Sequence, residues 1–164
     1  MDNYYKTLAR KRMGAGALIF NEKGELLIVQ ISYKNYWSIP GGIVEDNESP
    51  RQACIREIKE EIGLDFKNLQ FVCVDYTQAD KTKNKDESLQ FMFSGGKISE
   101  EEIKNIKIDE GEVVEYNFVA PEKAVELLGG SVRSLVRRLP ACLEAIKENK
   151  GIYLEDGRNS FDIH

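Results

Sequence analysis

Three glutamates lie within a single turn of a segment that the sequence predicts to be helical. Glu57, Glu60 and Glu61 are separated by three and four positions, so on a helix over residues 50–62 they share one face. Carboxylates at this spacing repel one another, more strongly when they are partly buried. A divalent cation that prefers oxygen ligands, such as Mg²⁺ or Mn²⁺, would offset this repulsion and leave positions for phosphate oxygens. Taken alone, the pattern is more often a solvated acidic face.

The two ends of this helix are marked in the sequence. Ser49 is a good N-cap, Pro50 suits the first helical position, and Gln52 completes a capping box. Gly63 is a natural stop at the C-terminal end. The isoleucines of the segment form a separate apolar stripe, which is expected in the core: Ile55, Ile58 and Ile62.

The residues around the glutamates are more specific than the glutamates themselves. Residues 42–64 read GIVEDNESPRQACIREIKEEIGL, and residues 37–41 before them read WSIPG. This order resembles the signature of the Nudix hydrolases, a MutT-like family, and every defined position of the signature is filled. The match at fixed spacing favours a metal site over a solvated face.

The resemblance implies a fold and a reaction. The fold would be α/β, a Nudix-type α/β/α sandwich with a mixed β-sheet. The reaction would be Mg²⁺- or Mn²⁺-dependent cleavage of a nucleoside diphosphate linked to another moiety, by attack of water on phosphorus. By the same resemblance, Glu57, Glu60 and Glu61 are metal ligands or catalytic bases, and the main-chain carbonyl of Gly41 is a further ligand. Which glutamate acts as the base stays open.

The resemblance also gives supporting roles to other residues of the signature at 42–64, which we call the Nudix box or simply the box. Arg56 is expected to orient Glu57 and is counted with the catalytic group. Gly42, Glu48 and Gly63 are expected to be structural, with Glu48 a partner of the loop and helix rather than a metal ligand.

A further acidic ligand is expected from outside the box, with three candidates. Glu115 is favoured because it lies in a strand-like run, and Glu112 and Glu87 are the alternatives. For each of them, a surface carboxylate is the competing interpretation.

Candidate substrate contacts lie before the box. Arg10 and Arg12, with Lys11 between them, could meet a terminal phosphate or form a solvated arm. Tyr33 and Tyr36 could stack on a base. Trp37 is expected to pack in the core or against a loop. Tyr76 and Phe93 could line the cleft in which the base would stack.

The remaining chain is expected to supply a sheet and further helices. A hairpin is predicted at 15–20 and 25–32, and Pro40-Gly41-Gly42 is expected to break the chain after a short strand at 37–39. A single domain over 1–150 is expected, with a basic arm at 1–12 and a tail at 151–164. The other expected elements are strands at 69–76, 88–93 and 113–119, a polar loop at 77–87, and helices at 121–128 and 131–149.

Composition narrows the function classes. The 164 residues carry a net charge of −5, which argues against a protein that coats nucleic acid. The single histidine, His164, is the last residue, so histidine-based triads are not expected. Three widely spaced cysteines indicate reduced thiols, and no stretch has the length of a signal peptide or a membrane span, so a cytoplasmic protein without a membrane partner is expected.

Several functions stay open at this point. The main expectation is a pyrophosphatase for a (d)NTP or related small nucleotide, with ADP-ribose or a nucleotide sugar as the alternative. A non-catalytic nucleotide-sensing module is disfavoured because all three box glutamates are present, and a capped-RNA hydrolase lacks an evident basic track. A homodimer contact through the arginines of the last helix competes with packing of that helix on the sheet: Arg133, Arg137 and Arg138.

Overall fold

A computed structural model describes residues 3–33, 36–128 and 133–159, and for residues 133 and 134 only the backbone. Its strands form one mixed sheet, in the order β3-β2-β1-β6-β5-β8-β9. Two further strands join this path, since β4 pairs with β1 and β7 pairs with β2. The bounds are β1 Arg12–Asn21, β2 Leu26–Ile31, β3 Tyr36–Ser38, β4 Gly41–Ile43, β5 Gln70–Thr77, β6 Ser88–Ile98, β7 Val113–Val119, β8 Ile152–Glu155 and β9 Arg158–Asn159.

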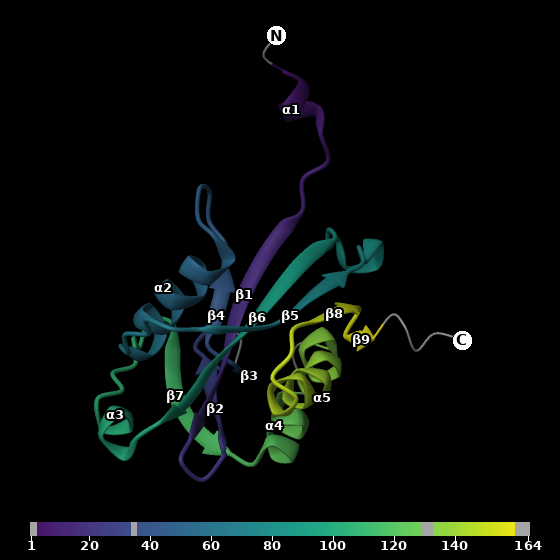
Figure 1. The fold of residues 1–164 in the computed structure, drawn as a ribbon. Helices are drawn as coiled ribbons and strands as arrows, with labels where there is room; N and C mark the ends of the chain where they lie inside the picture. Colours follow the sequence, from purple (N-terminus) through teal and green to yellow (C-terminus); the bar gives the residue numbers. More distant parts are fainter. Residues whose placement is uncertain (1–2, 34–35, 129–132, 160–164) are drawn as a thin grey trace.

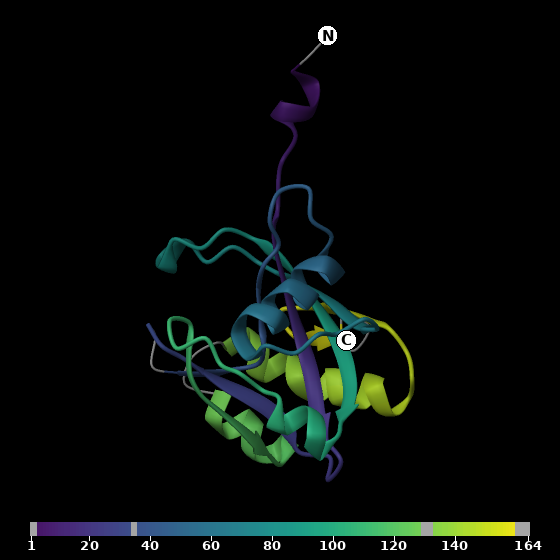
Figure 2. The ribbon, with the colours of Figure 1, turned by 90° about the vertical axis from the view of Figure 1, so that its left-hand side faces the viewer.

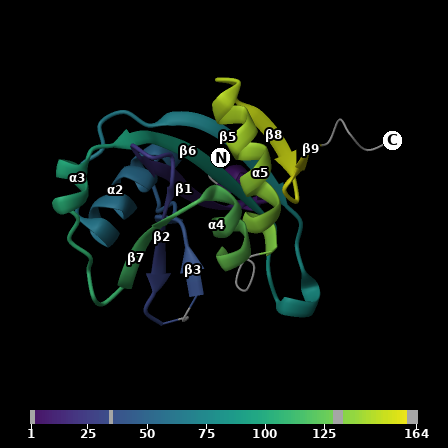
Figure 3. The ribbon, with the colours of Figure 1, turned by 90° about the horizontal axis from the view of Figure 1, so that it is seen from below.

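Helices cover both faces of this sheet, which confirms the α/β/α sandwich. In Figure 1, α2 lies on one side of β1 and β6, and α4 and α5 lie on the other; Figure 3 shows the same layers from below. The helices are α1 Tyr4–Thr7, α2 Pro50–Ile62, α3 Glu100–Lys104, α4 Pro121–Leu128 and α5 Arg133–Lys147.

Alternating side chains of the central strands feed two separate cores. On β1, Ala17 and Ile19 pack under α2, whereas Leu18 packs under α4 and α5. On β2, Leu27 and Ile28 divide in the same way. Because both faces are covered, these strands are apolar on both sides.

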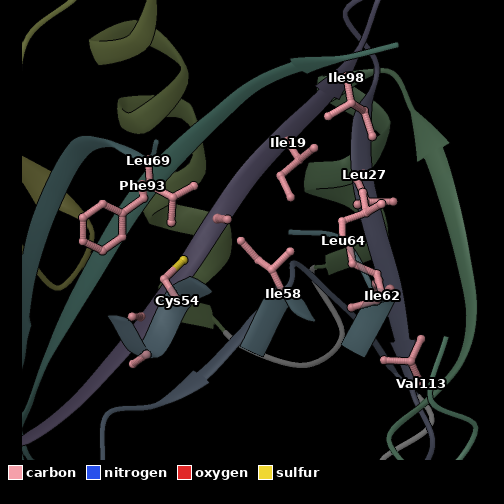
Figure 4. Close-up of a cluster of buried hydrophobic side chains, with 14 of the residues drawn as sticks. Ile19, Leu27, Cys54, Ile58, Ile62, Leu64, Leu69, Phe93, Ile98 and Val113 are labelled. Carbon is pink, nitrogen blue, oxygen red and sulfur yellow. The ribbon is translucent and has the colours of Figure 1, made fainter. Parts of the chain in front are cut away.

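The helix α2 is anchored by its apolar stripe. Figure 4 shows Cys54, Ile58 and Ile62 pointing at the sheet, where Ile19 and Leu27 lie. Ile58 and Ile62 are fully buried, so each contributes roughly 1.5–3 kcal/mol of hydrophobic stabilisation. The opposite face of α2, which carries the glutamates, therefore faces strand β4.

The first half of the chain agrees with the sequence except at one strand. The predicted hairpin is present, with Phe20 paired to Leu26. The expected break at Pro40-Gly41-Gly42 is wrong in part, because Gly41–Ile43 forms the short strand β4, antiparallel to β1. Glycine is required at position 41, since its φ is +148° and a Cβ there would overlap the carbonyl oxygen of Ala15.

The C-terminal segment is the second difference. The sheet continues beyond residue 150, because β8 pairs in parallel with β5 and turns back into β9. The sheet therefore extends past the predicted boundary at residue 150, since Ile152–Glu155 supplies the hydrogen bonds that the edge of β5 needs. Residues 160–164, including His164, lie outside the described residues.

The arm at the N-terminus extends away from the sheet. Residues 3–11 are exposed, and they include the single turn of α1. Figures 1 and 2 both show α1 set apart from the layers of the sandwich. Across the described ranges, no helix has the length and apolar character needed to cross a bilayer.

Candidate functional site

The helix that carries the glutamates has the ends that the sequence predicted. Gln52 N–H donates to Ser49 Oγ at 3.2 Å, and Ser49 N–H donates to Gln52 Oε1 at 3.0 Å, which completes the capping box. Gly63 ends the helix in the left-handed region, with φ +74°, and its N–H donates to Lys59 O at 3.0 Å. These caps fix where the first turn begins and so the direction in which each glutamate points.

Glu61 is the most buried of the three box glutamates. Its side chain is 4% exposed and accepts a hydrogen bond from Gly41 N–H at 2.9 Å. Burial raises the pKa of Glu61 to about 8, since the hydrogen bond from Gly41 offsets only part of the desolvation, and Glu57, Glu112 and Glu60 add to the rise. A buried carboxylate among other carboxylates is an unfavourable arrangement that a cation would relieve.

Glu57 lies beside Gly42, where β4 passes the helix. Desolvation raises the pKa of Glu57, against the hydrogen bond and charge of Arg56, and Glu60 and Glu112 raise it further. A Cβ at position 42 would overlap the carboxylate of Glu57. The absence of a side chain at Gly42 therefore allows the Glu57 carboxylate to pack against the strand.

Arg56 joins the helix to the loop before it. Its Nε and Nη2 donate to the two oxygens of Glu48, at 2.9 and 3.0 Å, and Nη2 also donates to Ile43 O at 3.1 Å. Its Nη1 donates to Glu57 Oε1 and Glu60 Oε2, both at 2.9 Å. These bonds raise the pKa of Arg56 and lower that of Glu48. The arginine therefore holds Glu57 and Glu60 in position, and Glu48 holds the arginine.

A cavity of about 500 Å³ opens beside the carboxylates of Glu57 and Glu61. We call it the glutamate cavity. Glu57 and Glu61 form its wall on the α2 side, and Glu112 faces them from the turn before β7. The other lining residues are Ile31, Tyr33, Tyr36, Ser38, Gly41, Gly42, Ile43 and Glu45.

The three candidates for an acidic ligand outside the box differ in whether they line the glutamate cavity. Glu112 lines the glutamate cavity, whereas Glu115 is exposed on β7, opposite Gln30, and is not among the lining residues. Glu87 accepts a hydrogen bond from Tyr76 at 2.6 Å and is paired with Lys11. Glu115, the preferred candidate, therefore lies away from the glutamate cavity, and Glu112 is the candidate of the three that lines it.

The donor set around the glutamate cavity suits a hard divalent cation. Carboxylates of Glu57, Glu61 and Glu112 and the main chain of Gly41 offer only oxygen ligands, which Mg²⁺ and Mn²⁺ accept. Within the described ranges, no three acidic, histidine or cysteine side chains converge on one point. Arg56 donates a hydrogen bond to Glu57, and Gly41 donates one to Glu61. Side-chain rotation of Glu57, Glu60 and Glu61 would be needed to bind the ion.

The candidate substrate residues fall into three groups. Tyr33 and Tyr36 line the glutamate cavity, and Tyr33 is 73% exposed. Arg10 and Arg12 are exposed on the arm and at the start of β1, and neither lines this cavity. The remaining candidates are engaged elsewhere, in core packing or in the hydrogen bond to Glu87: Trp37, Phe93 and Tyr76.

A second cavity, of about 260 Å³, continues from the first toward α5, and the sequence did not predict it. We call it the α5 cavity. Its floor includes Arg138, which is 4% exposed and paired with Asp75, at 0% exposure. Arg138 falls on the apolar stripe of α5, three residues after Leu135 and four before Cys142, and this was the signal available in the sequence. The other lining residues are Ala15, Gly16, Tyr36, Ser38, Ile39, Gly41, Gly42, Ile43, Gln90 and Met92.

Comparison with known proteins finds a matching family model and several relatives. The family model described as NUDIX domain matches residues 10–139. Among curated proteins, an RNA pyrophosphohydrolase of Marinomonas sp. (strain MWYL1) is 41% identical over 54 residues, which are 33% of this chain and 34% of that protein. An 8-oxo-dGTP diphosphatase of Proteus vulgaris is 42% identical over 55 residues, 31% of this chain and 49% of that protein. The chain thus aligns with between a third and a half of these relatives' lengths.

Solved structures share the whole fold at lower identity. The MutT protein from Methanosarcina mazei Go1 superposes with a TM-score of 0.65 at 24% identity, over 88% of this chain and 99% of that chain. A UDP-X diphosphatase superposes with a TM-score of 0.68 at 19% identity, over 92% of this chain and 70% of that chain. The mixed sheet between α2 and the C-terminal helices is therefore a shared architecture.

Proposed function

This chain belongs to the NUDIX domain family, and from that we propose that it is a divalent-metal-dependent pyrophosphohydrolase. Its substrate would be a nucleoside diphosphate linked to another moiety, most simply a nucleoside triphosphate or a related small nucleotide. The observation that carries the proposal is the burial of Glu61 next to Glu57 on the wall of an open cavity. Two carboxylates with raised pKa, facing space that a diphosphate could enter, serve no purpose in packing.

Each part of the site has a role in the proposed reaction. Mg²⁺ or Mn²⁺, held by Glu57, Glu60, Glu61 and the Gly41 carbonyl with Glu112 as the acidic ligand from outside the box, would neutralise the diphosphate and lower the pKa of a bound water. Arg56 orients Glu57 and Glu60 through Nη1. A carboxylate whose pKa is raised is the better proton acceptor near neutral pH, and both Glu57 and Glu61 meet this condition.

The products follow from the bond that is broken. Water attacks phosphorus, the bridging P–O bond breaks, and the attacking oxygen stays on one phosphate. A nucleoside triphosphate would give a nucleoside monophosphate and pyrophosphate. Tyr33 and Tyr36, at the mouth of the glutamate cavity, would contact the nucleoside side of the substrate.

The test is a substrate panel with purified protein in Mg²⁺, in Mn²⁺ and in excess chelator. The panel contains nucleoside triphosphates, ADP-ribose, a UDP-sugar and a 5′-triphosphorylated RNA oligonucleotide, and it scores monophosphate, phosphate and pyrophosphate release. We expect cleavage of a small nucleotide with either metal and no cleavage in chelator. If no compound is cleaved under any metal, the enzyme proposal is wrong.

Three of these arms represent specific alternatives. ADP-ribose and the nucleotide sugar share the bond but place a second sugar in the cavity. The RNA arm is included because relatives of this chain carry the name RNA pyrophosphohydrolase. The net charge of −5 favours a small nucleotide over a long polyanion.

A further inference from the structure

Two cysteine thiols meet between the sheet and helix α5. Cys73 lies on β5 and Cys142 on α5, 69 positions apart in the chain, and their sulfur atoms are 3.3 Å apart. Both residues are 0% exposed, and Figure 3 shows α5 packed against this part of the sheet. The third cysteine, Cys54, is buried under α2 on the other face of the sheet, as Figure 4 shows. The fold therefore brings two of the three thiols into contact and keeps the third away from them.

A neighbouring ion pair keeps the two thiols opposite each other. On β5, Asp75 follows Cys73 by two residues. On α5, Arg138 precedes Cys142 by four residues. Two strand residues span about 6.6 Å and four helical residues span about 6 Å, so both pairs fit one crossing in which β5 and α5 run in opposite directions. Arg138 Nε donates to Asp75 Oδ2 at 2.8 Å, and Gly157 N–H donates to Asp75 Oδ1 at 3.0 Å, so the ion pair fixes the register in which the sulfurs meet.

The two thiols are protected from oxidation while α5 lies on the sheet. The hydrogen bond with Cys73 and burial raise the pKa of Cys142, so its sulfur carries a proton at neutral pH. The thiolate is the form that attacks an oxidant, so oxidation in the closed structure is slow. It requires a local opening in which α5 separates from β5 and admits a small oxidant. When α5 returns to the sheet, the second sulfur meets the first.

We propose that Cys73 and Cys142 are a site of disulfide formation by peroxides, and that the disulfide locks α5 onto β5. In the open form, the thiolate of one cysteine attacks an oxygen of hydrogen peroxide, the O–O bond breaks, and a sulfenic acid and water form. The sulfur of the other cysteine then attacks the sulfenic sulfur, and water leaves as the S–S bond forms. In total, two thiols and one hydrogen peroxide give one disulfide and two waters, with the sulfurs oxidised and the peroxide reduced.

The disulfide would join two segments that are distant in the chain. The loop that it closes spans 69 positions, and closing it restricts the unfolded chain and so stabilises the folded form. The bond would also prevent α5 from separating from β5. The core under α5, which includes Leu139 and Leu154, would then stay covered in the oxidised protein.

The test treats purified, metal-free protein with hydrogen peroxide at low protein concentration and maps the products by non-reducing digestion and mass spectrometry. We expect one disulfide, between the peptides that contain Cys73 and Cys142, and its reversal by dithiothreitol. The Tm of the oxidised protein should be higher than that of the reduced protein by about 5 °C or more. Urea below the unfolding transition should speed the reaction, because it favours the open form. These measurements need neither metal nor substrate, so their failure would leave the proposed function unaffected.

Variants of the three cysteines provide the controls. Cys54→Ala removes a buried cysteine outside the pair and should leave both the disulfide and the increase in Tm unchanged. Cys142→Ala should give neither, and Cys73→Ala makes the same test if the first variant does not fold. The proposal is overturned if both thiols of the pair stay free after peroxide treatment, or if Cys54 is found in the disulfide. It is also overturned if the oxidised protein melts at or below the temperature of the reduced protein.

Discussion

Gly41 donates its main-chain N–H to Glu61 Oε2 at 2.9 Å, which connects strand β4 to the buried end of helix α2. The bond stabilises the ionised carboxylate, but burial outweighs it, and the pKa of Glu61 rises to about 8. The carboxyl group therefore keeps its proton at neutral pH until a cation replaces it. This balance makes both stability and activity sensitive to pH.

The stability of the metal-free protein should fall as the pH rises. Because the pKa of Glu61 is raised from its ordinary 4.5 to about 8, the native state holds a proton that the unfolded chain has lost across this interval. The free energy of unfolding should drop by roughly 3 kcal/mol between about pH 5 and pH 7.5. Urea unfolding in chelator at several pH values measures it.

Two comparisons identify Glu61 as the source of this slope. Glu61→Gln removes the titrating group and should flatten the dependence on pH over the same interval. Added Mg²⁺ should also flatten it in wild type, because the cation binds the ionised carboxylates. A slope of unchanged size in Glu61→Gln would contradict the assignment, because only the part from Glu57, whose pKa is also raised, should remain.

Arg56 should matter for both stability and rate. Arg56→Gln removes the bonds to Glu48, Glu57 and Glu60 and should lower the free energy of unfolding by about 1–3 kcal/mol, with kcat reduced more than KM is changed. The control is Lys59→Gln on the same helix, whose exposed pair with Asp65 should contribute below about 1 kcal/mol and nothing to turnover. Equal effects of the two substitutions would refute the role of Arg56.

Gly42→Ala tests the room that Glu57 needs. The added Cβ would displace the flexible end of Glu57, so the fold should persist while kcat/KM drops roughly 10- to 100-fold. Glu57→Gln alone and the double variant complete a cycle. The two effects should not add, because both act on one carboxylate, and full additivity would show that Gly42 acts elsewhere.

The buried pair of Asp75 and Arg138 should be important for folding. Asp75→Ala leaves the guanidinium buried without its counter-ion, which should lower the free energy of unfolding by about 3–5 kcal/mol. Lys123→Ala, which removes an exposed pair with Glu126, should change it by less than about 1 kcal/mol. Thermal and denaturant unfolding of both variants give the comparison, and similar values would argue against a buried pair.

The sequence predicted those parts of the site that depend on local chemistry. The helix 50–62 was found because Ser49, Pro50, Gln52 and Gly63 act within a few residues of the ends that they define. The three glutamates follow from helical spacing alone. The strand β7 and the helix α4 also have the predicted bounds, since turn residues flank them.

The parts that the sequence could not predict depend on distant partners. The strand β4 exists only because β1 supplies its hydrogen bonds, and three residues around two glycines carry no strand pattern of their own. Glu112, rather than Glu115, faces the glutamates because of how the turn before β7 packs beside α2. The sequence shows Asp75 as a lone carboxylate in an apolar strand and Arg138 as an arginine on an apolar helix stripe. It does not show that the two side chains pair with each other.

The most direct test measures turnover and folding together in Glu60→Gln and Glu61→Gln. With the best substrate of the panel and saturating Mg²⁺, we expect each substitution to reduce kcat by more than ~100-fold while the circular dichroism spectrum and cooperative unfolding are retained. Titration with Mn²⁺ should show weaker binding in both variants than in wild type. Near-normal turnover in both, with metal binding unchanged, would contradict the claim that the box glutamates of α2 form the metal site.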